Sequence, residues 1–245
     1  MPPLPLIYAD DAVLVLHKPS GLLSVPGRGP ENQDCLSTRV QQQFADAQIV
    51  HRLDMGTSGL LVMARGLQAQ RHLQRQFAQR QAEKGYIAIV QGQPVAEPMQ
   101  WHTIDAPLIV DWPNRPRSII DTTHGKPSRT CWRIVPAGAQ HPGLAAHFYR
   151  PDAPHALVEL APETGRSHQI RVHMQSIGHP VVGDPIYGLK HGVAAPRLML
   201  HAHTLAFTHP RTGERMALTA PPPQAFLDGV EKLRLNGDAP LRLIP

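Results

Sequence analysis

The chain has 245 residues, of which 42% are hydrophobic and 18% are charged. This composition excludes a disordered protein, and the length allows one large domain or two small ones. No apolar run is long enough to cross a bilayer, and the proline-rich start lacks the features of a signal peptide. Only two cysteines are present, Cys35 and Cys131, which excludes a disulfide framework and leads us to expect a cytoplasmic protein.

The charge balance favours a polyanionic partner without requiring one. Lys and Arg number 24 against 19 Asp and Glu, so the formal net charge is +5. A basic chain is suited to bind nucleic acid, but many basic proteins bind nothing in particular.

The first third of the chain predicts alternating strands and helices. Residues 12–18 have the composition of a strand that ends at a Pro-Ser-Gly turn, and residues 36–44 predict a short helix. The apolar run at 60–64 has the length of a buried strand. Residues 67–84 then show helical periodicity.

The helix expected at 67–84 has two distinct stripes. Ala69, Leu73 and Phe77 form the apolar stripe, and Arg71 and Arg75 lie on another. The two arginines are explained either by a solvated helix face or by contact with RNA.

The remainder predicts more strands. Residues 85–92 form an aliphatic run between glycines, and a proline-rich loop at 111–117 contains Trp112, Arg115 and Arg117, which either contact RNA or close a turn. Further strand-like runs occur at 130–135, 145–149, 156–160 and 198–207. The pattern indicates an α+β fold with a mostly antiparallel central sheet and flanking helices. We expect one domain over 1–245, with its core at about 8–221 and a tail at 222–245 that adds one helix up to Leu235.

Residues 51–59, with the sequence HRLDMGTSG, contain the first candidate for chemistry. Asp54 lies between apolar runs and is flanked by His51 and Arg52. A carboxylate in such surroundings is costly unless it is paired, and paired carboxylates of this kind are frequent in active sites. The alternative is that Asp54 is a turn residue that caps its neighbours through Thr57 and Ser58.

Residues 164–174 predict a helix that carries a candidate partner for Asp54. Thr164 and Ser167 stand where helix caps are found, and Arg171 falls on the face turned away from the core. An arginine there is suited to hold a carboxylate in bidentate geometry and keep it ionised. An ordinary surface ion pair is the alternative.

Histidines raise the alternative of a metal site. His168, His173, His201 and His203 are among 15 histidines, but their spacing matches no hydrolytic metal motif. The sequence also lacks a Walker loop, a dinucleotide fingerprint and a nucleophile elbow, so we expect neither metal nor cofactor.

Taken together, the motifs resemble the RluA-type pseudouridine synthases over about residues 8–221. The resemblance rests on HRLDxxTSG at 51–59, KxYxAxV at 84–90 and GRxHQIRxH at 165–173, in that order. KPSGL at 18–22 and GHPxxGD at 178–184 add to it. The loops at 25–28 and 111–116 are most similar to the RluA subgroup, which modifies a large-subunit rRNA hairpin and a tRNA anticodon loop.

The resemblance implies a fold, a reaction and roles. An RNA pseudouridine synthase is an isomerase that detaches a uracil base, turns it and rejoins it through C5, without cofactor or metal. Asp54 would be the catalytic carboxylate, Arg171 its ion-pair partner, and Tyr86 the platform for the flipped base. Arg52 would brace the gap left in the RNA.

Further expectations follow for RNA binding. Arg71, Arg75, Arg115, Arg117, Arg166 and His168 are the remaining candidate RNA contacts. The partner is then a structured RNA, either an rRNA or a tRNA stem-loop, bound by a monomer. Gly85, next to Tyr86, is expected to loosen its strand. The extra N-terminal RNA-binding domain of many relatives is not seen, so target choice would come from the catalytic domain. A non-catalytic RNA-binding protein on the same fold is the alternative, and it would require a defect in Asp54, Tyr86 or Arg171.

Overall fold

The computed structural model describes residues 4–135, 155–188 and 195–235. Its strands are β1 (Leu6–Ala9), β2 (Val13–Lys18), β3 (Ala47–Ile49), β4 (Ser58–Arg65), β5 (Glu83–Gln91), β6 (His102–Asp105), β7 (Leu108–Val110), β8 (Ser118–Ile120), β9 (Arg129–Ile134), β10 (His155–Pro162), β11 (Leu200–Thr208) and β12 (Arg215–Thr219). Its helices are α1 (Leu36–Gln41), α2 (Gly66–Ala78), α3 (Gln169–Ser176) and α4 (Gln224–Leu235), with one 3-10 turn at Pro30–Asn32.

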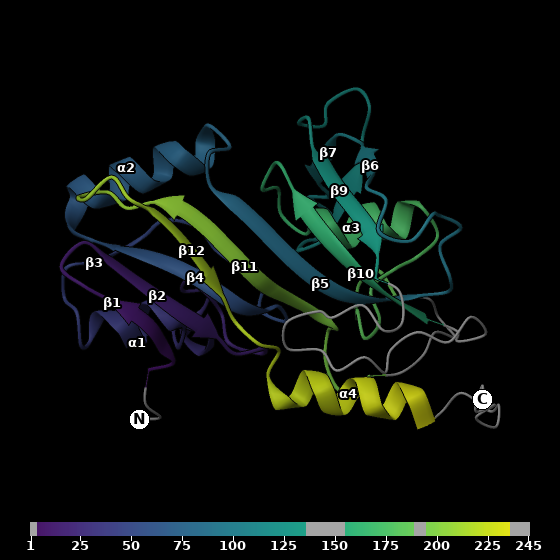
Figure 1. Cartoon of the computed structure of the whole chain (residues 1–245), viewed down its shortest axis with the longest axis horizontal. Helices are drawn as coiled ribbons and strands as arrows, with labels where there is room; N and C mark the ends of the chain where they lie inside the picture. Colours follow the sequence, from purple (N-terminus) through teal and green to yellow (C-terminus); the bar gives the residue numbers. More distant parts are fainter. Residues whose placement is uncertain (1–3, 136–154, 189–194, 236–245) are drawn as a thin grey trace.

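Ten of these strands form a single sheet that runs through the whole molecule (Figure 1). Its order is β1-β2-β4-β11-β5-β10-β9-β6, with β12 added beside β11 and β3 beside β4. Every pairing in this sheet is antiparallel except that of β4 with β11. The expected α+β class with a mostly antiparallel sheet is therefore confirmed.

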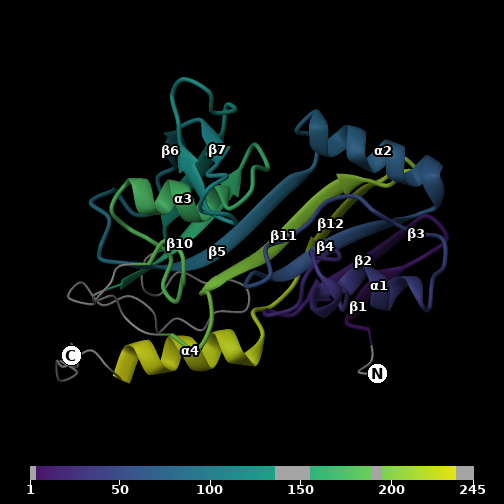
Figure 2. The same ribbon diagram turned by 180° about the vertical axis from the view of Figure 1, so that it is seen from behind.

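The unbroken apolar run of β4 is explained by burial on both faces. Leu60 and Val62 pack in a cluster with Leu73 of α2. Leu61 and Met63 point the other way and pack in a second cluster, to which α1 contributes Leu36 and Val40. Figure 1 shows α2 over one side of these strands, and Figure 2 shows α1 over the other. A strand covered on both sides reads as a continuous hydrophobic segment and not as an alternating one.

A third cluster joins β5, β9 and β10 to α3 and α4. Val90 and Val158 are fully buried at its centre, and Phe226 of α4 packs into it beside Met199. The helix expected to end at Leu235 is thus confirmed and covers this part of the sheet. Among the described residues, no helix combines the length and the apolar character needed to span a bilayer.

Three helices differ in extent from the sequence expectation. α1 ends at Gln41, not at 44. α2 ends at Ala78, not at 84, because Arg80 adopts a left-handed conformation (φ 59°) and the chain then enters β5. α3 begins at Gln169, and neither Thr164 nor Ser167 caps it. Thr164 donates its hydroxyl hydrogen to Gln169 Oε1 (2.7 Å), and His168, in the left-handed region, occupies the N-cap position.

The expectation for Gly85 was wrong. β5 pairs with β11 through Gly85, opposite Thr204, and the irregularity lies on β11 between Ala202 and Thr204. A Cβ on Gly85 would lie 2.2 Å from Thr204 Oγ1, so glycine allows the close approach of the two strands.

Short strands were not predicted, because runs of three to five residues carry too little periodicity. These are β1, β3, β6, β7, β8 and β12. The strand expected at 145–149 lies outside the described residues.

Candidate active site

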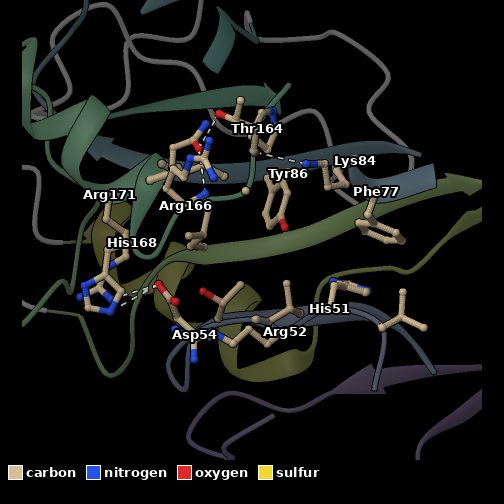
Figure 3. Close-up of a pocket in the computed structure, with 18 of the residues that line it drawn as sticks. His51, Arg52, Asp54, Phe77, Lys84, Tyr86, Thr164, Arg166, His168 and Arg171 are labelled. Atoms are coloured by element: carbon tan, nitrogen blue, oxygen red, sulfur yellow. Dashed lines mark hydrogen bonds and ion pairs between the residues drawn. The ribbon is translucent and has the colours of Figure 1, made fainter. Parts of the chain in front are cut away.

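A cavity of about 490 Å³ opens beside the middle of the sheet. One wall is the loop between β3 and β4, another is β5, and the third is the turn and first residues of α3 (Figure 3). Six of the predicted site residues line it: Arg52, Asp54, Tyr86, Arg166, His168 and Arg171. The structure thus brings together segments that lie far apart in the sequence.

The loop that carries Asp54 is held by bonds to its backbone. Thr57 donates its amide hydrogen to the Asp54 carbonyl (3.1 Å), so the turn foreseen for this stretch is present. The buried Lys18 ammonium donates to the carbonyls of Leu22 (2.7 Å) and Met55 (3.1 Å). These bonds leave the Asp54 side chain free to face the cavity.

A second set of bonds holds the end of the same loop. The Arg197 guanidinium donates to Ser58 Oγ (2.7 Å) and to the Leu200 carbonyl (3.2 Å). His201 Nδ1 lies 2.9 Å from the same Ser58 hydroxyl. This loop end is shielded from solvent, and burial lowers the pKa of Arg197 to about 10.

Arg171 pairs with Asp54, but not in the bidentate geometry expected. Its Nη1 lies 3.2 Å from Asp54 Oδ2, while Nε and Nη2 each donate to Asp184 at 2.7 Å. The Asp184 side chain is 0% exposed and that of Asp54 is 21% exposed. The inaccessible carboxylate needs the two strong bonds, whereas water can solvate part of Asp54.

Arg171 is also buried, contrary to its expected place on the outer face of the helix. Its side chain is 6% exposed, and its Cζ lies 5.0 Å from the centre of the Tyr187 ring. Burial alone would lower the pKa of Arg171, but the hydrogen bonds and charge of Asp184, together with Asp54, raise it. Burial would likewise raise the pKa of Asp184, and Arg171 lowers it below the ordinary value. Both groups are therefore charged at neutral pH.

Asp184 and Tyr187 were not among the predicted site residues. Asp184 also accepts hydrogen bonds from the backbone amides of Ile186 (2.9 Å) and Tyr187 (3.0 Å). The signal for Asp184 was present in the sequence: it is the last residue of the GHPxxGD motif and follows the apolar pair Val181 and Val182 after one glycine.

His168 is the second group that faces Asp54. Its Nε2 lies 3.9 Å from Asp54 Oδ2, and its Nδ1 lies 2.9 Å from the Tyr187 hydroxyl. Figure 3 shows His168 and Arg171 on the same side of Asp54. The residue predicted as an RNA contact thus lies beside the carboxylate and is only partly exposed.

Tyr86 projects from β5 into the cavity, toward the loop that carries Arg52 and Asp54 (Figure 3). The phenol is half-buried, and within the described residues its hydroxyl has no hydrogen-bond partner. Burial, and to a lesser degree Asp54, raise the pKa of Tyr86, so the phenol stays protonated.

Lys84, two residues before Tyr86, was noted as the first residue of the KxYxAxV motif but was not among the predicted site residues. Its ammonium donates to the Thr164 carbonyl (3.2 Å), and burial, with some help from Arg80, lowers its pKa to about 8. It adds a cation to the wall of the cavity.

The predicted neighbours of Asp54 have different surroundings. Arg52 is exposed at the rim. His51 is held inside: its Nε2 accepts a hydrogen bond from the Val62 amide (3.1 Å), and its ring stacks on Phe77 at 4.5 Å. Burial, and the charge of Lys84, lower the pKa of His51 to about 3, so this side chain is a neutral part of the scaffold.

The other predicted RNA contacts lie outside the cavity, except Arg166 at its rim. Arg71 and Arg75 are exposed on α2. Arg115 and Arg117 are exposed in the loop between β7 and β8, where Arg115 stacks on Trp112 at 4.5 Å. These two pairs of exposed arginines are thus separate from the residues that line the cavity.

Three of the four histidines considered as metal ligands form hydrogen bonds within the core. Across residues 4–135, 155–188 and 195–235, no three His, Cys, Asp or Glu side chains are arranged to hold a metal ion. His173 lies between Thr130 Oγ1 (2.9 Å) and the Ala106 carbonyl (3.0 Å), and His201 and His203 both approach the Ala220 carbonyl. They serve as buried polar residues of the core.

The chain is similar to known RNA-modifying proteins along most of its length. Residues 12–176 match the family model described as RNA pseudouridylate synthase. The Dual-specificity RNA pseudouridine synthase RluA of Escherichia coli (strain K12) is 46% identical over 222 residues, which is 90% of this chain and 94% of the relative. Its namesake in Vibrio vulnificus (strain CMCP6) is 42% identical over 98% of this chain and 91% of the relative.

Solved structures agree with this result. The Human RNA Pseudouridylate Synthase Domain Containing 1 is 26% identical and superposes with a TM-score of 0.68 over 97% of both chains. The Human RNA Pseudouridylate Synthase Domain Containing 4, at 22% identity, shares the fold with a TM-score of 0.69 over 94% of this chain and 92% of that one. Sequence motifs, fold and the geometry around Asp54 lead to one conclusion: the chain belongs to the RNA pseudouridylate synthase family of RNA-modifying isomerases.

Proposed function

We propose that this enzyme converts uridine to pseudouridine in stem-loops of both large-subunit rRNA and tRNA, with Asp54 as its catalytic carboxylate. The observation that carries the catalytic assignment is the position of Asp54 in the cavity, with Arg171 at 3.2 Å and His168 at 3.9 Å. The dual specificity is supported by the relatives that are named for it, which match at 42–46% identity over at least 90% of this chain.

The reaction that we propose needs a carboxylate near the anomeric carbon. In an attack at the sugar, Asp54 bonds to C1′ while the N1–C1′ bond breaks and its electron pair stays on the base. The base then turns, C5 bonds to C1′ as the carboxylate leaves, and the C5 proton is lost while N1 gains one. Arg171 supports this role because its guanidinium lies 3.2 Å from Asp54 Oδ2 and can hold the carboxylate in place.

We propose that Tyr86 holds the base during the turn. The uridine must leave its stack before its glycosidic bond can be reached. An aromatic ring that points into the cavity offers a flat surface for the extracted base. We also propose that Arg52, which is exposed at the rim, fills the gap that the base leaves in the RNA.

The RNA backbone would lie along the basic surfaces around the cavity. Arg166 lies at the rim, Arg71 and Arg75 on α2, and Arg115 and Arg117 in the loop between β7 and β8. Positive side chains around a recessed site suit a folded hairpin whose loop base enters the cavity. We also propose that the enzyme acts as a monomer, in the cytoplasm and without a metal ion, because the proposed catalytic groups all come from one chain and the step is an isomerisation.

The proposal is tested with RNA hairpins labelled with tritium at C5 of the target uridine. Release of tritium should occur with the parent enzyme, with or without a chelator. Asp54→Asn should lower the rate about 10³-fold or more while leaving hairpin affinity nearly unchanged. Asp228→Asn, an exposed aspartate on α4, is the matched control and should react like the parent.

Three outcomes would contradict this proposal. Turnover by Asp54→Asn at a rate comparable to the parent would remove the catalytic assignment. Loss of tritium release in the presence of a chelator would indicate a metal-assisted reaction instead. Reaction with an rRNA hairpin but not with a tRNA anticodon hairpin would restrict the dual specificity.

A further inference from the structure

His168 has a backbone conformation that is unusual for a residue other than glycine. It adopts φ 56° and ψ 18° at the N-terminus of α3, and its side chain makes no capping hydrogen bond to the helix. Left-handed residues other than glycine are uncommon and persist where the surroundings hold them. The side chain is instead held between Tyr187 and Asp54.

The hydrogen bonds of Tyr187 determine which ring nitrogen of His168 carries hydrogen. The backbone amide of Ser118 donates to the Tyr187 oxygen (2.7 Å), and an amide nitrogen cannot accept in return. The Tyr187 hydroxyl hydrogen therefore needs another acceptor, because the side chain is 1% exposed. Within the described residues, the acceptor in reach is His168 Nδ1 at 2.9 Å.

An Nδ1 that accepts a hydrogen bond has no hydrogen of its own. The neutral imidazole must then carry its hydrogen on Nε2. Burial lowers the pKa of His168, and Arg171 and Arg52 act in the same direction, while Asp54 and Asp184 oppose them. The neutral ring is thus favoured near pH 7.

The ring nitrogen that carries this hydrogen is the one that faces the carboxylate. Nε2 lies 3.9 Å from Asp54 Oδ2, the same oxygen that accepts from Arg171. This separation is too long for a hydrogen bond, but bonds of this kind are often long in free enzymes and shorten when substrate binds.

We propose that Tyr187 fixes His168 as the Nε2–H tautomer, and that His168 is a positioning residue which orients Asp54 by donating to Oδ2 when uridine is bound. With Arg171 and His168 both on Oδ2, the other carboxylate oxygen, Oδ1, is the one left to attack. This inference rests on the proposed role of Asp54 and deepens it. A second residue that orients the carboxylate also explains why a single 3.2 Å hydrogen bond from Arg171 is enough to hold Asp54 in position.

The tautomer is tested directly by NMR of the enzyme labelled with ¹⁵N-histidine. The His168 signals are assigned by their absence in His168→Gln. We expect the pattern of a neutral ring protonated on Nε2 in the parent, and a mixture of tautomers in Tyr187→Phe. Phe keeps the ring that Arg171 contacts and removes only the hydroxyl. A parent ring protonated on Nδ1 or doubly protonated near pH 7 would overturn the inference. This readout does not depend on activity, so it separates failure of the inference from failure of the proposed function.

The positioning role is tested by single-turnover rates and RNA affinity. His168→Ala should lower the rate about 10²-fold with RNA affinity within about twofold of the parent. His168→Gln, whose amide can donate from a similar position, should recover at least about tenfold of that loss. His124→Gln, an exposed histidine outside the cavity, is the control.

A double-variant cycle tests whether Tyr187 acts through His168. Tyr187→Phe alone should slow the reaction about tenfold, and adding it to His168→Ala should change little. Independent, additive effects would overturn the coupling. Equal rates for His168→Ala and the parent would overturn the positioning role, and so would a loss confined to RNA affinity. Circular dichroism and thermal melts of each variant ensure that only folded enzyme is compared.

Discussion

Asp184→Asn should destabilise the protein far more than Asp54→Asn, although only Asp54 is assigned to the reaction. Asp184 accepts four hydrogen bonds, two from Arg171 and two from backbone amides, and its side chain is fully buried. The variant removes the charge that neutralises a buried guanidinium. Losing one partner of such a pair costs about 3–5 kcal/mol.

Asp54→Asn should lose much less stability. Asp54 accepts one hydrogen bond from Arg171, at 3.2 Å, and its side chain is 21% exposed. Removing an interaction of this kind costs about 1 kcal/mol. For a chain of this size, Asp184→Asn should therefore melt about 6–20 °C below the parent, and Asp54→Asn only about 2–4 °C below it.

The measurement is urea unfolding followed by circular dichroism, with thermal melts as a second readout. Asp228→Asn provides the surface control. Activity should show the reverse order: Asp54→Asn should slow tritium release about 10³-fold or more, and Asp184→Asn should slow it less. If Asp184→Asn unfolded within about 1 kcal/mol of the parent, or Asp54→Asn were the less stable variant, the pair with Asp184 would not be what holds Arg171.

Three further predictions concern Tyr86, His51 and Gly59. Tyr86→Phe should keep hairpin affinity and Tyr86→Leu should lose about 1–3 kcal/mol of binding in filter assays; equal affinities would argue against stacking. His51 has a pKa of about 3 when folded and 6.5 as its ordinary value, so the unfolded chain binds more protons between these pH values. As the pH is lowered from 6.5 toward 3, the contribution of His51 should reduce the free energy of unfolding by about 1.4 kcal/mol per pH unit. His51→Gln should make this dependence on pH less steep, and identical slopes for the variant and the parent would refute the prediction. Gly59→Ala should destabilise by about 3 kcal/mol or more, because Gly59 has φ 116° and a Cβ there would lie 2.1 Å from the Ala202 carbonyl oxygen. Gly213→Ala, also at positive φ but in open space, should lose about 1 kcal/mol, and equal melting temperatures for the two would contradict the steric argument.

Much of the site was predictable because charge and burial conflict in the sequence itself. Asp54 between apolar runs required a cation, and the apolar face of α3 placed Arg171 on a rigid element. What could not be predicted was how one guanidinium divides its hydrogen bonds between two carboxylates. That division depends on the exposed fraction of each carboxylate, which only the packed structure provides.

The same limit explains the errors in the fold. The polar segment after Ala78 continues the helical composition, and nothing in its residue types reveals that Arg80 turns left-handed. The strand propensity of β5 was clear, but the need for Gly85 arises from Thr204, more than a hundred residues away. The composition of a long, apolar element such as β4 is enough to predict that element. Contacts between distant segments depend on how the whole sheet is assembled.

The parallel pairing of β4 with β11 has a consequence for the order of folding. We expect β4 to pair early with its antiparallel neighbour β2, since both lie within the first 65 residues. Its parallel neighbour β11 is synthesised much later. The hydrogen bond between Ser58 and His201 spans 143 positions, and the one between Arg171 and Asp54 spans 117. Contacts this distant carry a large loop-closure entropy and form slowly. During synthesis we therefore expect the Asp54 carboxylate to remain in water until α3 has left the ribosome. The ion pair of Asp54 with Arg171 should form only when the last third of the chain has joined the sheet.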